Sequence, residues 1–268
     1  MPNDLNAFRL IYGEADFLSG LTVDKFNDCL VCQILSLGID IRKDIILKAL
    51  YDVVSKYFKI RGIYLRCDVA LREKEGLEEY VGWYDKIPVT SQETTTEIVE
   101  NGLKYLVDFK EGQKTGFFLD QKYNRLTIRN LAKDMTVLDC CTNTGSFAMN
   151  AALGGAKKVM ALDISQKALL DAKKNFWLNN LNIDTYCADL FDYLRNLVDS
   201  KNKEYNLIIL DPPAFTKSKD TIKSALKGYQ EINYLAMKAL PRGGYLATAS
   251  CSHYASEEDF IRAIFNAS

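Results

Sequence analysis

The chain has 268 residues, 48% of them hydrophobic, and a formal net charge of −1, which suits one large or two modest globular domains. It has no apolar run of the roughly 18–20 residues that a membrane span needs and no signal-peptide segment at the N-terminus, so we expect a cytoplasmic protein with no membrane partner. The net charge neither supports nor excludes nucleic-acid binding, because a local basic face would not show in the total.

The first third of the chain, residues 1–110, predicts a small α+β domain. Alternating apolar residues, interrupted by glycines and an Asn-Asp pair, indicate three strands, Phe8–Tyr12, Leu21–Phe26 and Cys29–Leu37. From Asp40, a suitable N-cap, apolar residues recur at helical spacing until about Phe58. We therefore expect strands flanking one helix.

The rest of this domain contains a strand, a connecting segment and a hairpin. The strand Gly62–Arg66 follows the helix. Residues 72–96 are charged and then rich in Thr, Ser and Gln, which predicts a linker or a mobile flap. The turn Asn101-Gly102 predicts a hairpin between Glu97–Glu100 and Leu103–Phe109.

Seven cysteines make an odd number, and several lie inside apolar runs, as buried free thiols do in a reducing compartment. Cys29 and Cys32 form a C-x-x-C motif, but no second Cys or His pair is near and the single histidine, His253, is remote. Because a structural zinc site needs four ligands, we expect strand residues here and no metal site.

From about residue 112 apolar strands alternate with amphipathic helices. The expected segments are helix Asp120–Ala132, strand Thr136–Cys140, helix Ser146–Ala152, strand Lys158–Leu162, helix Ser165–Asn179, strand Thr185–Ala188, helix Leu190–Val198, strand Asn206–Leu210, helix Ile222–Leu240, strand Tyr245–Ala249 and helix Glu257–Phe265. Such alternation predicts an α/β fold with a doubly wound, mostly parallel sheet covered on both faces.

Four of these strands end in an acidic residue, at Asp139, Asp163, Asp189 and Asp211. Their carboxylates should project from the same edge of the sheet, where open α/β sheets bind ligands. Asp163 follows Asp139 at about the spacing at which a second acid meets ribose hydroxyls in nucleotide-binding folds. No G-x-G-x-x-G motif is present to hold a diphosphate, so S-adenosylmethionine fits better than NAD.

Five motifs together carry a resemblance to a known family. They are Gly112–Gln121 (GQKTGFFLDQ), Leu138–Phe147 (LDCCTNTGSF), Asp211–Phe215 (DPPAF), Gly228–Asn233 (GYQEIN) and Gly243–Ser252 (GGYLATASCS). With them the chain resembles class I S-adenosylmethionine-dependent methyltransferases, and within these the bacterial large-subunit ribosomal RNA cytosine-C5 methyltransferases. The resemblance implies a Rossmann-like class I methyltransferase sheet over residues 111–268, behind a small domain that contacts RNA.

The resemblance also assigns roles to positions of this sequence. The turn after the first core strand would wrap the methionine end of the cofactor, the second strand end would hold the ribose and the third the adenine edge, while an earlier loop would close over the cofactor. The cofactor-binding residues implied are Lys114, Thr115, Asp120, Asp139, Cys140, Cys141, Thr142, Asn143, Thr144, Gly145, Asp163, Ile164, Asp189, Leu190 and Asp211.

Cys251 is the expected catalytic nucleophile. C5 of a pyrimidine does not take a methyl group unaided, whereas a thiolate that adds at C6 makes C5 nucleophilic. This requires one cysteine, deprotonated at the moment of attack, and Cys251 lies just past the fifth core strand. Enzymes of the resembling family that are best known carry a second cysteine where this chain has Ala214, so the base that removes the C5 proton stays unassigned, with Asp211 the nearest candidate.

RNA contacts and assembly are less constrained. Lys217 and Lys219 are candidates for phosphate contacts and Phe215 for stacking on a flipped base; a solvated loop with a packed aromatic is the alternative. Arg61, Arg66, Arg72 and Arg42-Lys43 are candidates for a basic face of the small domain. Family members usually begin with a PUA domain and continue with two further strands, so we expect a truncated methyltransferase domain whose fifth strand is an edge, and a possible homodimer.

Three alternatives to cytosine-C5 transfer remain open at this point. One is methylation of uridine C5, in which an Asn or Asp usually follows the cysteine in place of Ser252. Another is methylation of guanine, which would leave Cys251 without a role. The third is a non-catalytic fragment that binds S-adenosylmethionine or RNA.

Overall fold

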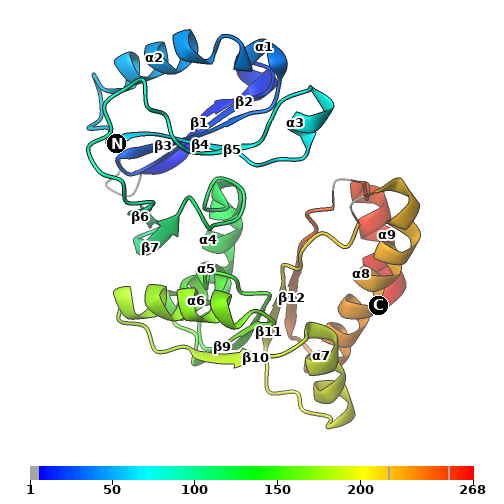
Figure 1. The fold of residues 1–268 in the computed structure, drawn as a ribbon. Coiled ribbons are helices and arrows are strands. Elements are labelled where there is room, and N and C mark those ends of the chain that lie inside the picture. Colours follow the sequence, from blue (N-terminus) through cyan, green and yellow to red (C-terminus); the bar gives the residue numbers. More distant parts are fainter. Residues whose placement is uncertain (1–5, 217, 253) are drawn as a thin grey trace. The chain divides into compact units, whose positions relative to one another are not determined.

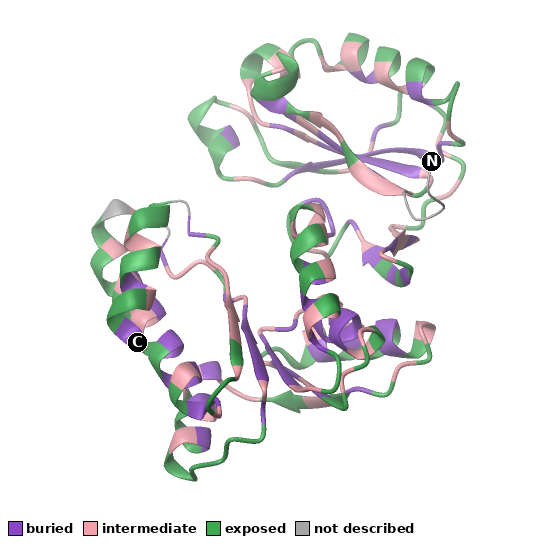
Figure 2. Ribbon diagram, turned by 180° about the vertical axis from the view of Figure 1, so that it is seen from behind, coloured by how far each residue is buried: buried purple, intermediate pink, exposed green. Residues whose placement is uncertain are grey.

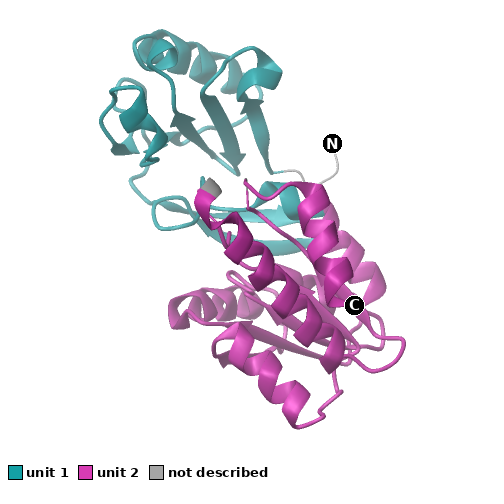
Figure 3. Cartoon of the chain, turned by 90° about the vertical axis from the view of Figure 1, so that its right-hand side faces the viewer, with its two compact units in different colours: residues 1–122 teal, residues 123–268 magenta. Residues whose placement is uncertain are grey.

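The structure is a computed structural model that describes residues 6–216, 218–252 and 254–268. It divides into two compact units, residues 1–122 and 123–268, which are coloured separately in Figure 3. The sequence places the boundary between the domains slightly earlier, after residue 110.

Unit 1 is built on a five-stranded sheet with the order β1-β2-β3-β4-β5. Neighbouring strands are antiparallel except for β3 and β4, which are parallel because two helices connect them. The elements are β1 (Ala7–Tyr12), η1 (Gly13–Asp16), β2 (Leu21–Phe26), β3 (Cys29–Ile34), α1 (Leu37–Asp40), α2 (Lys43–Val54), β4 (Gly62–Cys67), α3 (Leu71–Lys74) and β5 (Tyr80–Trp83). Cys29 and Cys32 are buried residues of β3, as predicted for this strand.

The single helix predicted from Asp40 is wrong, because the chain forms two helices that break at Ile41 and Arg42. Asp40 ends α1 instead of capping α2. Its carboxylate forms ion pairs with Arg72 at 3.2 Å and Lys43 at 3.1 Å. A residue suited to capping is thus used for a contact that is distant in sequence.

The prediction of a linker or mobile flap over residues 72–96 is also wrong. The segment contains most of α3 and all of β5, and β5 pairs antiparallel with β4. Arg72 donates from Nε to the carbonyl of Glu78 at 2.9 Å, which holds the connection between α3 and β5. Composition alone did not reveal a strand this short.

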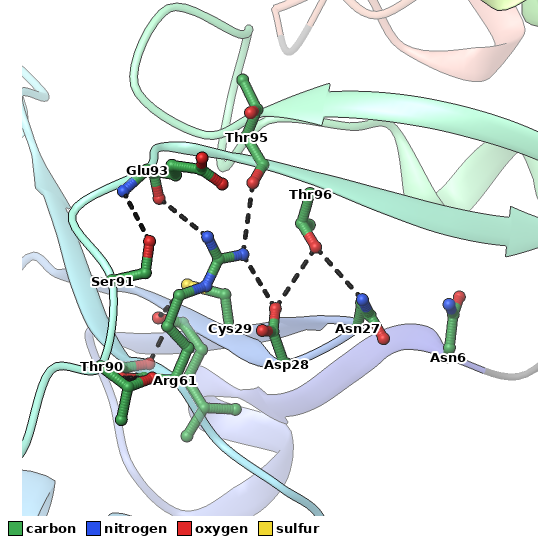
Figure 4. A network of polar contacts seen from close by, with 12 residues as sticks. Asn6, Asn27, Asp28, Cys29, Arg61, Thr90, Ser91, Glu93, Thr95 and Thr96 are labelled. Carbon is green, nitrogen blue, oxygen red and sulfur yellow. Dashed lines mark hydrogen bonds and ion pairs between the residues drawn. The ribbon is translucent and has the colours of Figure 1, made fainter. Parts of the chain in front are cut away.

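The basic face considered for unit 1 is not formed by Arg61, Arg66 and Arg72, because all three side chains are buried. Figure 4 shows Arg61 paired with Asp28 at 2.8 Å and donating to the carbonyls of Glu93 and Thr95. Arg66 likewise donates to the carbonyls of Phe109 and Gly112, at 2.7 and 2.9 Å. These guanidinium groups satisfy backbone carbonyls of irregular segments that would otherwise lack donors.

The predicted hairpin is confirmed as β6 (Thr95–Glu100) and β7 (Leu103–Asp108). Asn101 and Gly102 both have positive φ, 53° and 74°, as the two central residues of a type I′ turn require.

Unit 2 contains five parallel strands in the order β10-β9-β8-β11-β12, so the fold prediction is confirmed (Figure 1). The elements are η2 (Leu119–Gln121) and α4 (Lys122–Leu131), which lead in from unit 1, then β8 (Thr136–Cys140), α5 (Ser146–Leu153), β9 (Lys158–Asp163), α6 (Gln166–Leu178), β10 (Asp184–Cys187), α7 (Leu190–Asp199), β11 (Leu207–Leu210), η3 (Lys219–Thr221), α8 (Ile222–Ala239), β12 (Tyr245–Thr248) and α9 (Glu257–Ala267).

The central strands β8 and β11 are buried along almost their whole length, as the purple strands of Figure 2 show. Leu138 and Cys140 pack with α7, α8 and α9 on one face, and α5 and α6 pack on the other. The chain leaves β8 toward β9 on one side and later places β11 on the other side. This reversal of strand order is the point at which open α/β sheets bind ligands, at the carboxyl ends of the strands.

Candidate functional site

Asp139 is a buried carboxylate near the carboxyl end of β8. Its Oδ2 accepts hydrogen bonds from Thr142 Oγ1 at 2.6 Å and from the backbone N–H of Ala148, in α5, at 2.9 Å. Its Oδ1 is buried, and no donor among the described residues reaches it. Burial raises the pKa of Asp139 to about 7, and the charges of Asp211 and Asp163 act in the same direction.

The turn after β8 alternates left-handed residues. Cys141, Asn143 and Gly145 have φ values of 60°, 49° and 80°. Left-handed backbone is costly for a cysteine and tolerable for an asparagine, and such strain is concentrated at functional sites. At Gly145 a glycine is required for a second reason, since a Cβ there would lie 2.3 Å from Cε1 of Phe176.

Asp163 connects the turns that follow two neighbouring strands. Its Oδ2 accepts from the backbone N–H of Asn143 and its Oδ1 from that of Ser165, both at 2.9 Å. The next residue, Ile164, leaves 70% of its surface exposed. An apolar side chain is therefore available beside the acid predicted to hold a ribose.

Asp189 caps α7 by accepting from the backbone N–H groups of Phe191 and Asp192, at 2.8 and 3.1 Å. Leu190 and Cys140, both predicted to bind the cofactor, are buried members of the core cluster. Their side chains lie in the interior, so a contact with a ligand would come from the backbone of these two residues.

One thiol reports that the four acids lie together. The pKa of Cys141 is raised to about 12, first by burial and then by the charges of Asp163, Asp139, Asp211 and Asp189. Carboxylates from four strand ends thus act on one side chain. The resulting negative field favours a positively charged ligand.

Cys251 lies on a different turn of the same edge, after β12. It is exposed, and its Sγ contacts the carbonyl of Pro212 at 3.7 Å. Pro212 follows Asp211, which is half-buried at the end of β11. The structure therefore brings the two predicted catalytic residues to adjacent strand ends.

The loop after Asp211 departs in part from the predicted RNA contacts. The ring of Phe215 packs 4.6 Å from that of Tyr229 and 6.0 Å from that of Phe191, which is the packed-aromatic alternative. Lys217 lies outside the described residues, and so does the side chain of Lys219. Sequence reasoning did not single out Tyr229; its place in the Gly228–Asn233 motif was the available signal.

Three further predicted cofactor residues belong to unit 1. The hydroxyl of Thr115 donates to Asp24 at 2.6 Å, and both side chains are buried. Lys114 pairs with Asp120 at 3.3 Å, and its ammonium group lies 4.5 Å from the ring centroid of Phe118. Within unit 1 these residues hold their own loop.

Two structural searches bear on the site. Across the described chain, no group of three or more His, Cys, Asp or Glu side chains is arranged to hold a metal ion. None of the helices in the described parts of the chain has the length and apolar character to cross a membrane.

Comparison with known proteins identifies relatives over nearly the whole chain. Ribosomal RNA large subunit methyltransferase I from Aeromonas salmonicida is 41% identical over 269 residues, which is 98% of this chain and 65% of the relative. The protein of that name from Escherichia coli is 38% identical over 268 residues, with the same two coverages. The chain thus spans about two thirds of the length of these curated relatives.

A solved methyltransferase complexed with SAH has the same fold, with a TM-score of 0.82 and 24% identity over 98% of this chain and 66% of that one. A family model described as S-adenosylmethionine-dependent methyltransferase matches residues 77–262. This family uses the cofactor that the acidic strand ends predict. The chain therefore belongs to the S-adenosylmethionine-dependent methyltransferase family.

Proposed function

We propose that this chain transfers a methyl group from S-adenosylmethionine to C5 of a cytosine in large-subunit ribosomal RNA, with Cys251 as the nucleophile. The observation that carries the proposal is the position of the exposed thiol, 3.7 Å from the Pro212 carbonyl and next to the strand end that bears Asp211. The names of the two relatives, both large-subunit ribosomal RNA methyltransferases, support the substrate class.

The acidic edge of the sheet fits a cofactor that carries positive charge. S-adenosylmethionine, when bound, supplies a methyl group activated by a sulfonium and also carries an ammonium group. Asp139 would hold the cationic methionine end, since its Oδ1 is buried without a donor from the described residues. Asp163 would accept from the ribose hydroxyls, while the exposed Ile164 offers an apolar surface to the adenine.

Cys251 would activate the target base. Its thiolate adds to C6 of the cytosine, and the electron pair of the C5–C6 double bond moves to C5, which becomes nucleophilic. After methyl transfer, loss of the C5 proton restores the double bond and expels the thiolate. Asp211 is the nearest described carboxylate at the adjacent strand end, and we assign it to orient the base or accept that proton.

The alternative readings differ in what they require of Cys251. Methylation of guanine leaves the exposed thiol without a function, whereas uridine-C5 methylation uses it in the same way. Base identity is therefore decided by the product, and the thiol decides between the carbon-C5 reactions and the others.

The test is to incubate the chain and S-adenosylmethionine with ribosomal RNA that lacks the modification, and to identify the methylated nucleoside by mass spectrometry. The expected product is 5-methylcytidine, formed by the wild-type chain and not by Cys251→Ala. Methylguanosine, or undiminished 5-methylcytidine from Cys251→Ala, would contradict the proposal. Absence of cofactor binding in calorimetry would instead identify an inert fragment.

A further inference from the structure

The turn that carries Cys251 is held from the protein interior by one pair of hydroxyl groups. Those of Tyr229, in α8, and Ser252 lie 2.8 Å apart, and both side chains are buried. Cys251, the residue before Ser252, is exposed. The backbone N–H of Ser252 also donates to Ser250 Oγ at 3.3 Å. The exposed thiol is therefore followed directly by a residue that is fixed inside the fold.

The same tyrosine also supports the loop on the other side of the site. Its ring packs 4.6 Å from Phe215, in the loop that begins at Asp211, and 5.2 Å from Phe260 of α9. Gly228 makes room for this contact, since a Cβ there would lie 3.1 Å from Cδ2 of Phe215. One side chain thus contacts both segments that carry the predicted catalytic residues.

We propose that Tyr229 and Ser252 are positioning residues, whose hydrogen bond sets the direction and distance at which Cys251 meets the target base. The inference rests on the proposed function in taking Cys251 as the attacking group. Bond formation requires reacting atoms about 3–3.5 Å apart, and an error of about 1 Å costs up to roughly 10²-fold in rate. A turn fixed on only one side of the thiol needs such a contact to keep that geometry.

The hydroxyl of Tyr229 is the informative atom. A phenylalanine would fill the same space and keep the ring contacts with Phe215 and Phe260. What it would remove is the partner of the buried Ser252 hydroxyl, and a buried hydroxyl without a partner favours rearrangement of its turn. A role in packing alone predicts that phenylalanine serves as well as tyrosine.

The experiment compares Tyr229→Phe, Ser252→Ala and the double variant of the full chain. One measurement is kcat and KM for S-adenosylmethionine with ribosomal RNA. The other is alkylation of Cys251 by iodoacetamide as a function of pH, without cofactor, with the exposed Cys187 of β10 as the reference thiol in the same molecule. We expect each single variant to lower kcat about tenfold with KM unchanged, and to change the alkylation profile of Cys251 while that of Cys187 stays the same. The double variant should resemble the singles, because the two hydroxyls act as one unit.

Tyr193→Phe is the matched control, because Tyr193 and Tyr205 form another hydroxyl pair of 2.8 Å in unit 2. It should lower stability and leave the reactivity of Cys251 unchanged. The inference is overturned if Tyr229→Phe matches this control in kcat and in Cys251 alkylation, or if Cys251 and Cys187 change together. Retention of methyl transfer by Cys251→Ala would overturn the proposed function, whereas the alkylation profiles would still decide whether the hydroxyl pair orients the thiol.

Discussion

Two turns at the same edge of one sheet differ in nearly every physical respect. The turn after β8 is compressed, with three left-handed residues and a thiol, Cys141, whose pKa is raised to about 12. The turn after β12 exposes its thiol, Cys251, and is held by a hydroxyl pair beneath it. The first is organised around buried negative charge and the second around an accessible nucleophile.

The contrast shows how one fold separates binding from chemistry. Carboxylates at strand ends favour a cationic ligand, but the same charges disfavour a thiolate among them. A nucleophilic thiol therefore has to lie on another strand end. The chain has cysteines in both places, and their surroundings assign them different roles.

The most severe way to break this comparison is Cys251→Ala. Loss of a covalent nucleophile should lower methyl transfer by roughly 10³-fold or more, because C5 is then not activated. S-adenosylmethionine affinity, measured by calorimetry, should stay unchanged, since the cofactor residues lie on other turns. Equal loss of affinity would show that the two turns are not separate in function.

The difference between the two thiols can also be measured directly. At pH 8 a thiol with a pKa of about 12 is ionised in roughly one molecule in 10⁴, so Cys141 should resist alkylation. We expect iodoacetamide to modify Cys251 at least about 10²-fold faster than Cys141, as read by peptide mapping of the native chain. Comparable labelling of both residues would contradict the assigned roles.

The compression of the first turn predicts a large stability loss for Gly145→Ala. Gly243→Ala is its control, because Gly243 has a similar φ, 82° against 80°, and nothing within 4 Å of an added Cβ. Both variants lose about 1–2 kcal/mol through left-handed backbone. Gly145→Ala should lose about 2 kcal/mol more, since its Cβ would lie 2.3 Å from Phe176.

Urea unfolding of the two glycine variants gives the comparison. Equal losses in free energy of unfolding would mean that Phe176 moves aside and that the turn is not compressed.

The buried charge of the first turn predicts a smaller effect that depends on pH. The folded pKa of Asp139, about 7, lies above its ordinary value of 3.8, so the folded chain retains a proton that the unfolded chain loses. The stability that this group contributes is full below about pH 4 and declines as pH rises to about 7. Asp139→Asn removes this titration, so the variant should lose less stability than the wild type between pH 5 and pH 8.

The exposed Asp171→Asn is a suitable control for that measurement, because it should keep the pH dependence of the wild type. An Asp139→Asn variant that keeps the same dependence would show that Asp139 is ionised throughout. In the proposed site, the neutral amide should also weaken S-adenosylmethionine binding at pH 8, where the wild-type carboxylate is charged.

The sequence determined the alternating strands and helices of unit 2, the acidic strand ends and the position of Cys251 after the last strand. These are local features, because periodicity and turn residues act within a few positions of the chain. The same local signal correctly predicted the Asn101-Gly102 hairpin.

Only the tertiary structure decided the roles of residues whose partners are distant in sequence. Arg61, Arg66 and Arg72 suggested a basic surface, yet each is buried against carbonyls or carboxylates from elsewhere in the chain. Tyr229 gained its interest only when Ser252 was placed 2.8 Å from its hydroxyl. Burial of a charged or polar group is stable only when such partners arrive, and local pattern carries no information about their arrival.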